Sequence, residues 1–226
     1  SPENVLLEIK KNVEVFNAKE IAIMDDTFNL DIERAKKICY LLKREKIDVF
    51  LNLYSGLRAD HINKSLLNAL RMVGVNRITM GVESGNQEVV NKVGKELDLE
   101  KVLKAVKLCK KYNLITDGYF ILGHPFDTLE TMHQTIDFAI KADLDHAYFF
   151  IATPFPGTEL YEIVKKNGNL LVDMDYGSHS HIVEGKAQFE TENFTAKQVE
   201  FFYLLSYKRF YFRISKIIKL SVVYTR

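Results

Sequence analysis

Acidic side chains follow short apolar runs at two points in this sequence. Asp25 and Asp26 come directly after the run Ile21–Met24. Glu83 comes directly after the run Arg77–Val82. A carboxylate in such a place can accept hydrogen bonds from an ammonium group or from the vicinal hydroxyls of a ribose. The structural alternatives are that the two aspartates cap the following helix and that Glu83 bonds to neighbouring strand ends.

Glycine and proline mark two later points of the same kind. Gly118 and Gly123 lie inside and directly after the apolar run Ile115–Leu122, as if a flat group lay against it, although a tight turn explains Gly123 equally well. Pro154 follows the last run and fixes the backbone, which leaves carbonyl groups free to bond to an adenine-like edge. The alternative for this segment is a rigid turn before the next helix.

The elements that position these residues are successive βα units. Short apolar runs alternate five times with longer amphipathic segments, which is typical of a parallel sheet covered by helices on both faces. Ligands of such sheets bind at the carboxyl ends of the strands, so we expect the residues described above to share one edge. The predicted strands are Ile21–Met24, Val49–Tyr54, Arg77–Val82, Ile115–Leu122 and Ala147–Ala152.

Helix start and stop signals separate the predicted strands. Residues suited to an N-cap precede four of the helices, namely Asp31, Asn63, Asp98 and Asp127. Asp127 is followed three residues later by Glu130, as in a capping box. The alternation stops after Asn167, so we expect one domain over residues 1–168 and a C-terminal loop and helix over 169–226. The predicted helices cover about residues 3–16, 32–46, 63–74, 99–112 and 127–141, with one more from near Glu159 and a long aromatic one from Thr195 to about Ile218.

Composition excludes several classes of protein. Lys and Arg total 31 against 30 Asp and Glu, so no global field draws the chain to a polyanion. The two cysteines, Cys39 and Cys109, are too few for a disulfide scaffold, a four-thiolate zinc site or a cluster held by three thiolates. Both occupy apolar helix positions and are interpreted as buried core thiols. No run of about eighteen apolar residues occurs and the start lacks a signal-peptide pattern, which predicts a cytoplasmic protein without a membrane span.

Several segments, taken together in this order and spacing, resemble the radical S-adenosylmethionine (radical SAM) enzymes. The resemblance is greatest to the group with a preceding cobalamin-binding domain, and it covers residues from about 1 to 167. The aromatic and basic tail also resembles the C-terminal extension of that group, though less specifically. The segments are Asp25–Phe28, Gly81–Gly85, Gly118–Pro125 with Thr128–Thr131, and Pro154–Tyr161.

The resemblance implies a partial (β/α)6 TIM-like barrel without its first strand, an α/β fold with S-adenosylmethionine bound across the strand tips. Asp25 or Asp26 would then lie near the amino group of the ligand, and Glu83 would hold the ribose. Lys95 would reach the methionine carboxylate, unless it is a solvated lysine at a helix end. The complete set of implied ligand-binding residues is Asp25, Asp26, Glu83, Ser84, Lys95, Gly118, Gly123, Thr153, Pro154 and Phe155, of which Gly118 to Gly123 and Thr153 to Phe155 would flank the adenine.

The reaction of this family needs a 4Fe-4S cluster on a Cys-x3-Cys-x2-Cys loop after the first strand, and this sequence contains no such loop. The resemblance therefore implies that the cluster ligands, and a cobalamin domain if there is one, lie upstream in a larger enzyme. We expect this chain alone to be inactive, and the complete enzyme to use an electron donor for the cluster. The radical chemistry would be methylation or a rearrangement. The sequence does not decide the oligomeric state or the substrate, whether a small molecule or a tRNA.

Two further classes of function stay open. The chain could be a non-catalytic module that binds an adenosyl ligand or a partner. Alternatively, the basic and aromatic tail could bind RNA or an anionic membrane surface, unless its aromatics pack on the barrel. From Phe201 onward the chain contains no acid and six cations, namely Lys208, Arg209, Arg213, Lys216, Lys219 and Arg226.

Three other polar residues carry weaker expectations. His179 and His181 lie in a polar segment with no third ligand nearby, so we predict no metal site there. Asp117 directly precedes the glycine at position 118, and we expect its side chain to face the barrel interior and touch substrate.

Overall fold

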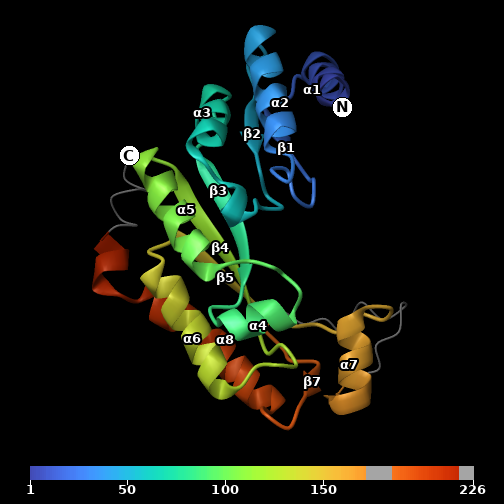
Figure 1. Cartoon of the computed structure of the whole chain (residues 1–226), viewed down its shortest axis with the longest axis vertical. Helices are drawn as coiled ribbons and strands as arrows, with labels where there is room; N and C mark the ends of the chain where they lie inside the picture. Colours follow the sequence, from blue (N-terminus) through green and yellow to red (C-terminus); the bar gives the residue numbers. More distant parts are fainter. Residues whose placement is uncertain (172–184, 219–226) are drawn as a thin grey trace. The chain divides into compact units, whose positions relative to one another are not determined.

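The structure, a computed structural model, describes residues 1–171 and 185–218 (Figure 1). The chain divides into two compact units, each described by itself below. Unit 1 contains Ser1–Gly81, Asp98–Gly118 and Leu144–His146, and unit 2 contains Val82–Leu97, Tyr119–Asp143 and the described residues from Ala147 onward. The domain boundary expected near residue 168 stays a prediction.

The five predicted strands are present, but they form two sheets. In the first, Glu20 pairs with Phe50 and Ala22 with Asn52, so its strands are parallel. The second has the order β3-β4-β5, and backbone hydrogen bonds join Thr116 to Asp145 and Leu122 to Ala152 in parallel sense. The strands are β1 (Glu20–Ala22), β2 (Phe50–Asn52), β3 (Arg77–Glu83), β4 (Ile115–Leu122) and β5 (His146–Ile151).

Differences from the predicted strands have local causes. The strand β2 ends at Asn52 because Leu53 begins a turn. The carbonyl of Leu53 accepts a hydrogen bond from Gly56 N at 3.3 Å. A single parallel bridge between Leu57 and Met80 is all that extends pairing from this segment to β3. The short antiparallel pair β6 (Asn169–Leu170) and β7 (Phe189–Glu190) was not predicted from the sequence.

The helices follow the predicted positions closely. Asp31, Asn63 and Asp98 each accept a hydrogen bond from the first turn of the helix that follows, as expected for N-caps. The short helix α4 and the 3-10 helix η1 were not predicted. The bounds are α1 (Pro2–Phe16), α2 (Ile32–Arg44), η1 (Ala59–His61), α3 (Lys64–Met72), α4 (Gln87–Lys92), α5 (Leu99–Lys111), α6 (Leu129–Lys141), α7 (Glu159–Asn167) and α8 (Ala196–Tyr211).

Two helix boundaries were predicted wrongly. Thr128, not Asp127, is the N-cap of α6, and it forms its capping box with Thr131 rather than with Glu130. Asp127 is instead drawn into the preceding loop, where it accepts a hydrogen bond from His124 N at 2.9 Å. The long C-terminal helix ends at Tyr211 instead of continuing unbroken to Ile218.

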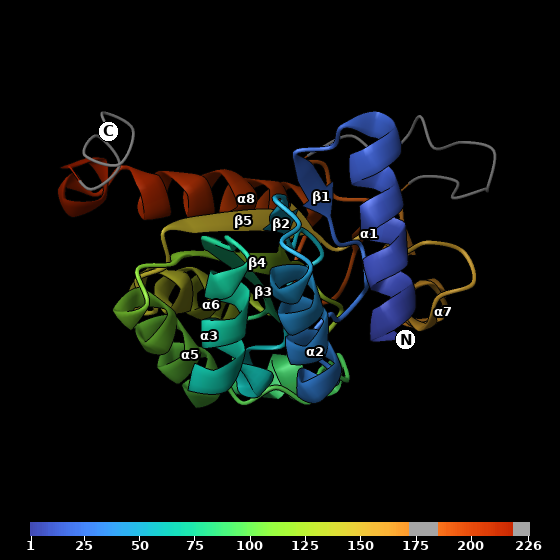
Figure 2. The ribbon, with the colours of Figure 1, turned by 90° about the horizontal axis from the view of Figure 1, so that it is seen from above.

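In unit 1 the helices α1, α2 and α3 lie side by side (Figure 2). The side chains of Ile38, Leu66 and Leu70 are fully buried, and burial of one such side chain stabilises the fold by about 1.5–3 kcal/mol. Cys39 on α2 and Cys109 on α5 are also fully buried, as predicted. The helices predicted to be amphipathic therefore pack by apolar side chains.

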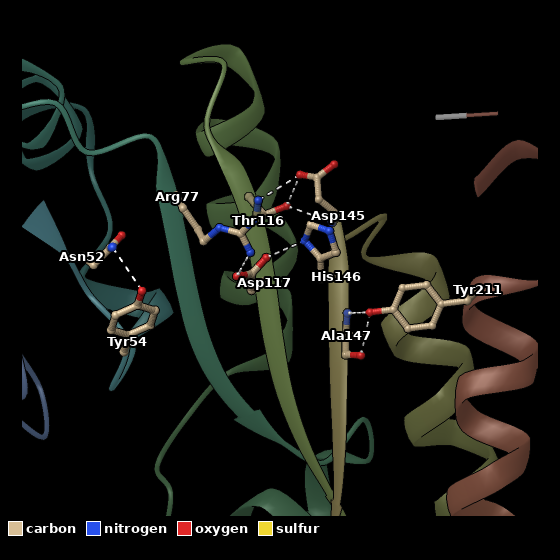
Figure 3. Close-up of polar contacts among 9 residues, drawn as sticks. All are labelled: Asn52, Tyr54, Arg77, Thr116, Asp117, Asp145, His146, Ala147 and Tyr211. Carbon is tan, nitrogen blue, oxygen red and sulfur yellow. Dashed lines mark hydrogen bonds and ion pairs between the residues drawn. The ribbon is translucent and has the colours of Figure 1, made fainter. Parts of the chain in front are cut away.

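In unit 2 the helix α8 covers the free edge of β5. The Tyr211 hydroxyl accepts from Ala147 N at 3.2 Å and donates to Ala147 O at 3.1 Å (Figure 3). Tyr207 bonds in the same way to Phe149 N and O, at 3.2 Å each. These hydroxyls replace the missing strand partners, so the edge is closed against further pairing.

The cations of the tail also make internal contacts in the part that the structure describes. Arg209 forms an ion pair of 2.8 Å with Asp137 of α6. Arg213 and Lys216 both lie over the ring of Phe210, at 5.0 and 4.9 Å from its centroid. The sequence left open whether the tail binds RNA or a membrane surface or packs its aromatics on the protein. These contacts support packing. Lys219 and Arg226 lie outside the described residues.

Candidate ligand site at the end of strand β3

The backbone at the end of β3 turns sharply at Glu83. This residue has a φ of 68°, in the left-handed region that L-residues other than glycine, asparagine and aspartate rarely adopt. Ser84 N donates to Val82 O at 3.0 Å, and the bond together with the positive φ defines a γ-turn with Glu83 at its centre. Such a conformation costs on the order of 1–3 kcal/mol and persists only where the surroundings enforce it.

The carboxylate on this turn forms an ion pair with Lys95. Lys95 lies just beyond α4, where Gly94 has a φ of 72° and Lys95 N donates to Val90 O at 3.2 Å. The exposed fractions of the two side chains are 20% for Glu83 and 29% for Lys95, so the pair is largely shielded from water. The structure therefore brings together two predicted site residues that are twelve positions apart in the sequence.

The next two residues pack against α6. Ser84 is fully buried and its hydroxyl lies 3.1 Å from Thr135 Oγ1, so any contact of Ser84 with a ligand would come from its backbone. A Cβ on Gly85 would lie 2.5 Å from Phe138 Cβ. The backbone at this glycine is therefore approached closely by a helix of the protein itself.

The segment after β5 is a compact turn. Phe155 N donates to Thr153 O at 3.1 Å, and Phe155 O accepts from the N–H and the hydroxyl of Thr158 at 3.1 and 2.6 Å. These carbonyls are thus used inside the turn, as the structural alternative expected. Pro154 is buried, whereas the Phe155 ring is 45% exposed and offers a flat apolar surface.

The loop after β4 is also tightly built. Gly123 has a φ of 76°, and a Cβ there would lie 2.8 Å from Val199 Cγ1 of α8, so both the turn and the packing require glycine. Gly118, within β4, is buried. The turn explanation therefore accounts for Gly123.

Sequence reasoning overlooked two titratable groups in this loop. His124 is 8% exposed, its Nε2 has no hydrogen-bond partner among the residues that the structure describes, and burial lowers its pKa to about 4. Burial raises the pKa of Asp127 to about 6, although its Oδ1 accepts from the Thr131 hydroxyl at 2.6 Å. The one signal in the sequence was a threonine, Thr131, four residues after Asp127. This pattern looks like a helix cap, and that interpretation gave no indication that the carboxylate is buried.

The aspartates after β1 lie in unit 1 and are exposed. Asp25 forms an ion pair of 3.2 Å with Arg34, and its side chain is 47% exposed. Asp26 is exposed too. Because Asp31 caps α2, the alternative that Asp25 and Asp26 cap this helix is wrong.

Asp117 belongs to a polar cluster of unit 1 (Figure 3). Its Oδ2 accepts from Arg77 Nη1 at 2.7 Å, and its Oδ1 lies 2.9 Å from His146 Nδ1. The side chain is 4% exposed. Both oxygens have protein partners, and the contact with substrate stays a prediction.

The cysteines do not fit an iron–sulfur cluster. Each is fully buried within a helix, and burial raises the pKa of Cys39 and of Cys109 to about 12, whereas cluster ligands are thiolates. Within residues 1–171 and 185–218 no group of three or more His, Cys, Asp or Glu could hold a metal ion. His179 and His181 lie outside this part of the chain. No helix in the described residues is long and apolar enough to cross a membrane.

Comparisons of this sequence with known proteins point to one superfamily. The sequence profile of the Radical SAM superfamily matches residues 1–139. The chain is 34% identical to an uncharacterized methyltransferase of Pyrococcus horikoshii, over 97% of this chain and 46% of that protein. It is 24% identical to the anaerobic magnesium-protoporphyrin IX monomethyl ester cyclase of Rubrivivax gelatinosus, over 71% of this chain and 29% of that one. The chain thus spans less than half the length of these relatives.

A solved structure shares the fold. The radical S-adenosylmethionine methyltransferase TsrM from Kitasatospora setae, with cobalamin and a 4Fe-4S cluster bound, superposes with a TM-score of 0.64 at 19% identity. The match covers 74% of this chain and 32% of that one. This likeness confirms the predicted fold class, an α/β fold of the partial TIM-like barrel type.

Proposed function

This chain belongs to the radical SAM superfamily, and we propose from that premise that it carries the S-adenosylmethionine-binding part of a radical SAM enzyme. The observation that carries the proposal is the Glu83–Lys95 ion pair on a strained turn at the end of β3. Together with a reducing 4Fe-4S cluster, S-adenosylmethionine would supply a 5′-deoxyadenosyl radical. No residue of this chain is assigned to the cluster.

The ion pair matches two groups of the ligand, the ribose and the carboxylate. Glu83 would accept hydrogen bonds from the ribose hydroxyls, and Lys95 would bind the α-carboxylate. Without ligand the two side chains neutralise each other. The bound carboxylate would take over Lys95, and Glu83 would bond to the ribose, so neither charge would be left unpaired.

Other predicted contacts within unit 2 add to the proposed site. The exposed ring of Phe155 is suited to stack on the adenine, beside Thr153 and Pro154. Ser84 would contribute its backbone. Val199 fills the space beside Gly123, and the adenine contact of Gly118, which belongs to unit 1, stays a prediction. Asp25 and Asp26 belong to unit 1, and their contact with the amino group stays a prediction.

For the complete protein we propose cobalamin-dependent methyl transfer. A relative and the structural neighbour are methyltransferases, and that neighbour binds cobalamin. The relationship to a cyclase favours a cyclisation as the second candidate. The buried cysteines would also suit a module that binds an adenosyl ligand without chemistry.

Calorimetric titration of the full chain tests the proposal with two ligands. S-adenosylmethionine has both a ribose and a carboxylate, whereas 5′-methylthioadenosine has only the ribose. We expect Glu83→Gln to weaken both ligands about tenfold or more, because a hydrogen bond to a charged group is lost. Lys95→Met should weaken S-adenosylmethionine about tenfold and leave methylthioadenosine unchanged.

The matched control is Lys92→Met. Lys92 lies three residues before Lys95 but pairs with Glu88 on the exposed side of α4, at 2.7 Å. We expect this variant to bind both ligands like the unmodified chain. Unchanged affinity of Glu83→Gln for both ligands would contradict the proposed function.

A further inference from the structure

A chain of hydroxyl groups connects the Glu83 turn to the interior of α6. Thr135 is 1% exposed, and its Oγ1 lies 3.0 Å from Thr131 O in the preceding helical turn. The Thr135 hydroxyl donates to that carbonyl, and therefore Ser84 must donate to Thr135 across their 3.1 Å contact. Gly85 N also donates to Thr135 Oγ1, at 3.0 Å. One buried hydroxyl thus holds the two residues that follow Glu83.

The same helix also holds the start of α4. Asn86 Nδ2 donates to Gln134 Oε1 at 2.6 Å, and Asn86 Oδ1 accepts from Val89 N at 2.9 Å as the N-cap of α4. Asn86 N donates to Ser84 Oγ at 3.2 Å. Because α4 leads to Lys95, both members of the ion pair are connected to α6 by short segments.

Gly85 removes the remaining freedom of this loop. A Cβ at position 85 would lie 2.6 Å from Thr135 Cα and 2.7 Å from Gln134 O, so the loop backbone is in direct contact with the backbone of α6. Glutamate at a φ of 68° is strained, and outside contacts must hold it there. The contacts that the structure offers for this are those with Thr135 and Gln134.

We propose that Thr135 is the positioning residue of the ligand site. Its hydroxyl fixes Ser84 and Gly85 and thereby holds the Glu83 carboxylate where a ligand meets it, although Thr135 does not itself touch the ligand. This inference rests on the proposed function of Glu83. Without the hydroxyl the turn relaxes, and the carboxylate is no longer preorganised.

The test compares two substitutions of Thr135 in the full chain. Thr135→Val keeps the shape of the side chain and removes the hydroxyl, whereas Thr135→Ser keeps the hydroxyl. We expect Thr135→Val to bind S-adenosylmethionine about tenfold more weakly and Thr135→Ser to bind it nearly as well as the unmodified chain. Ser206→Ala is the control, because Ser206 is another fully buried helix hydroxyl that bonds only within α8, to Tyr203 O at 2.6 Å.

A double-mutant cycle separates positioning from a general loss of structure. In the Glu83→Gln background Thr135→Val should have no further effect on affinity, because the group that it positions is already gone. Additive losses in the cycle would overturn the proposal, as would a failure of Thr135→Ser to restore binding. Circular dichroism shows whether each variant is folded.

The outcomes also distinguish this inference from the proposed function. If Glu83→Gln weakens binding and folded Thr135→Val does not, positioning by Thr135 is wrong and the proposed function stands. If Glu83→Gln has no effect, both are wrong. Should Thr135→Val not fold, Ser84→Ala removes two bonds of the network, the one to Thr135 Oγ1 and the one from Asn86 N, and is expected to weaken binding about threefold. Unchanged affinity of that folded variant would then overturn the proposal.

Discussion

The ends of strands β3 and β1 carry the same kind of residue in opposite surroundings. Glu83 lies at a φ of 68°, paired with Lys95 and followed by residues bonded to α6. Asp25 is 47% exposed, and its ion pair with Arg34 is open to water. A carboxylate after a strand is therefore only a candidate, and the contacts around it decide whether its position is defined well enough for binding.

Breaking the packing under the β3 loop should have the largest effect. We expect Gly85→Ala to lower the free energy of unfolding by about 3 kcal/mol, because the new methyl group would overlap Phe138 and the backbone of α6. Urea denaturation measures this loss. The control is Gly94→Ala, where nothing lies within 4 Å of the new Cβ and only the φ of 72° opposes alanine, at about 1 kcal/mol. Equal losses at the two glycines would contradict the close packing at Gly85.

The loop after β4 extends the comparison to a buried carboxylate whose effect on stability depends on pH. The pKa of Asp127 is raised by burial to about 6, from an ordinary value of 3.8. The stability that protonated Asp127 contributes is complete below pH 3.8 and is lost as the pH rises through about 6. Between pH 4 and 7 the unmodified chain should therefore lose on the order of 2–3 kcal/mol relative to Asp127→Asn.

The contribution of the neighbouring histidine to stability changes with pH in the opposite direction. Burial lowers the pKa of His124 from 6.5 to about 4, so its contribution is present above pH 6.5 and lost as the pH falls through about 4. Both proteins contain His124, and its effect cancels in their difference. Unfolding free energies measured across this pH range give that difference, and a value independent of pH would show that the Asp127 carboxylate is solvated.

A substitution that relieves the strain at Glu83 should change the free energy of unfolding less than the preceding two. We expect Glu83→Asn to change the free energy of unfolding by no more than about 1 kcal/mol. Asparagine adopts a positive φ more readily than glutamate does, which offsets the loss of the ion pair. The same variant should lose affinity for S-adenosylmethionine. Denaturation and calorimetry together test this, and a large destabilisation would mean that Glu83 serves the fold instead of a ligand.

The smallest effect is expected at β1. Asp25→Asn should change the free energy of unfolding by less than about 0.5 kcal/mol, because exposed ion pairs contribute little. Salt titration of the unmodified chain provides the control, since added salt screens the same pair. A loss above about 1 kcal/mol would show that the β1 end is as firmly built as the β3 end.

Much of this arrangement was predictable from the sequence. Hydrophobic runs predicted the strands because β3 and β4 are buried on both faces, and side-chain oxygens before helices predicted the N-caps at Asp31, Asn63 and Asp98. Glu83 and Lys95 were expected at one site, and they form an ion pair. These features depend on residues close in sequence or on the fixed geometry of βα units.

The remainder depends on contacts between distant segments. Glutamate has no preference for a positive φ. The hydrogen bonds that fix its turn come from Thr135, 52 positions further along the chain. Aspartate and threonine are both good N-caps, so propensity alone could not choose between Asp127 and Thr128. Tyr211 ends α8 without a glycine or proline to signal the end.

The most direct test of the account is a crystal structure of the full chain with S-adenosylmethionine bound. We predict that the Glu83 carboxylate lies within about 2.6–3.2 Å of the ribose hydroxyls and that Lys95 has turned from Glu83 to the ligand carboxylate. The bonds from Ser84 and Gly85 to Thr135 should be retained. A ligand bound elsewhere, with the Glu83–Lys95 pair intact, would contradict the assignment of this site.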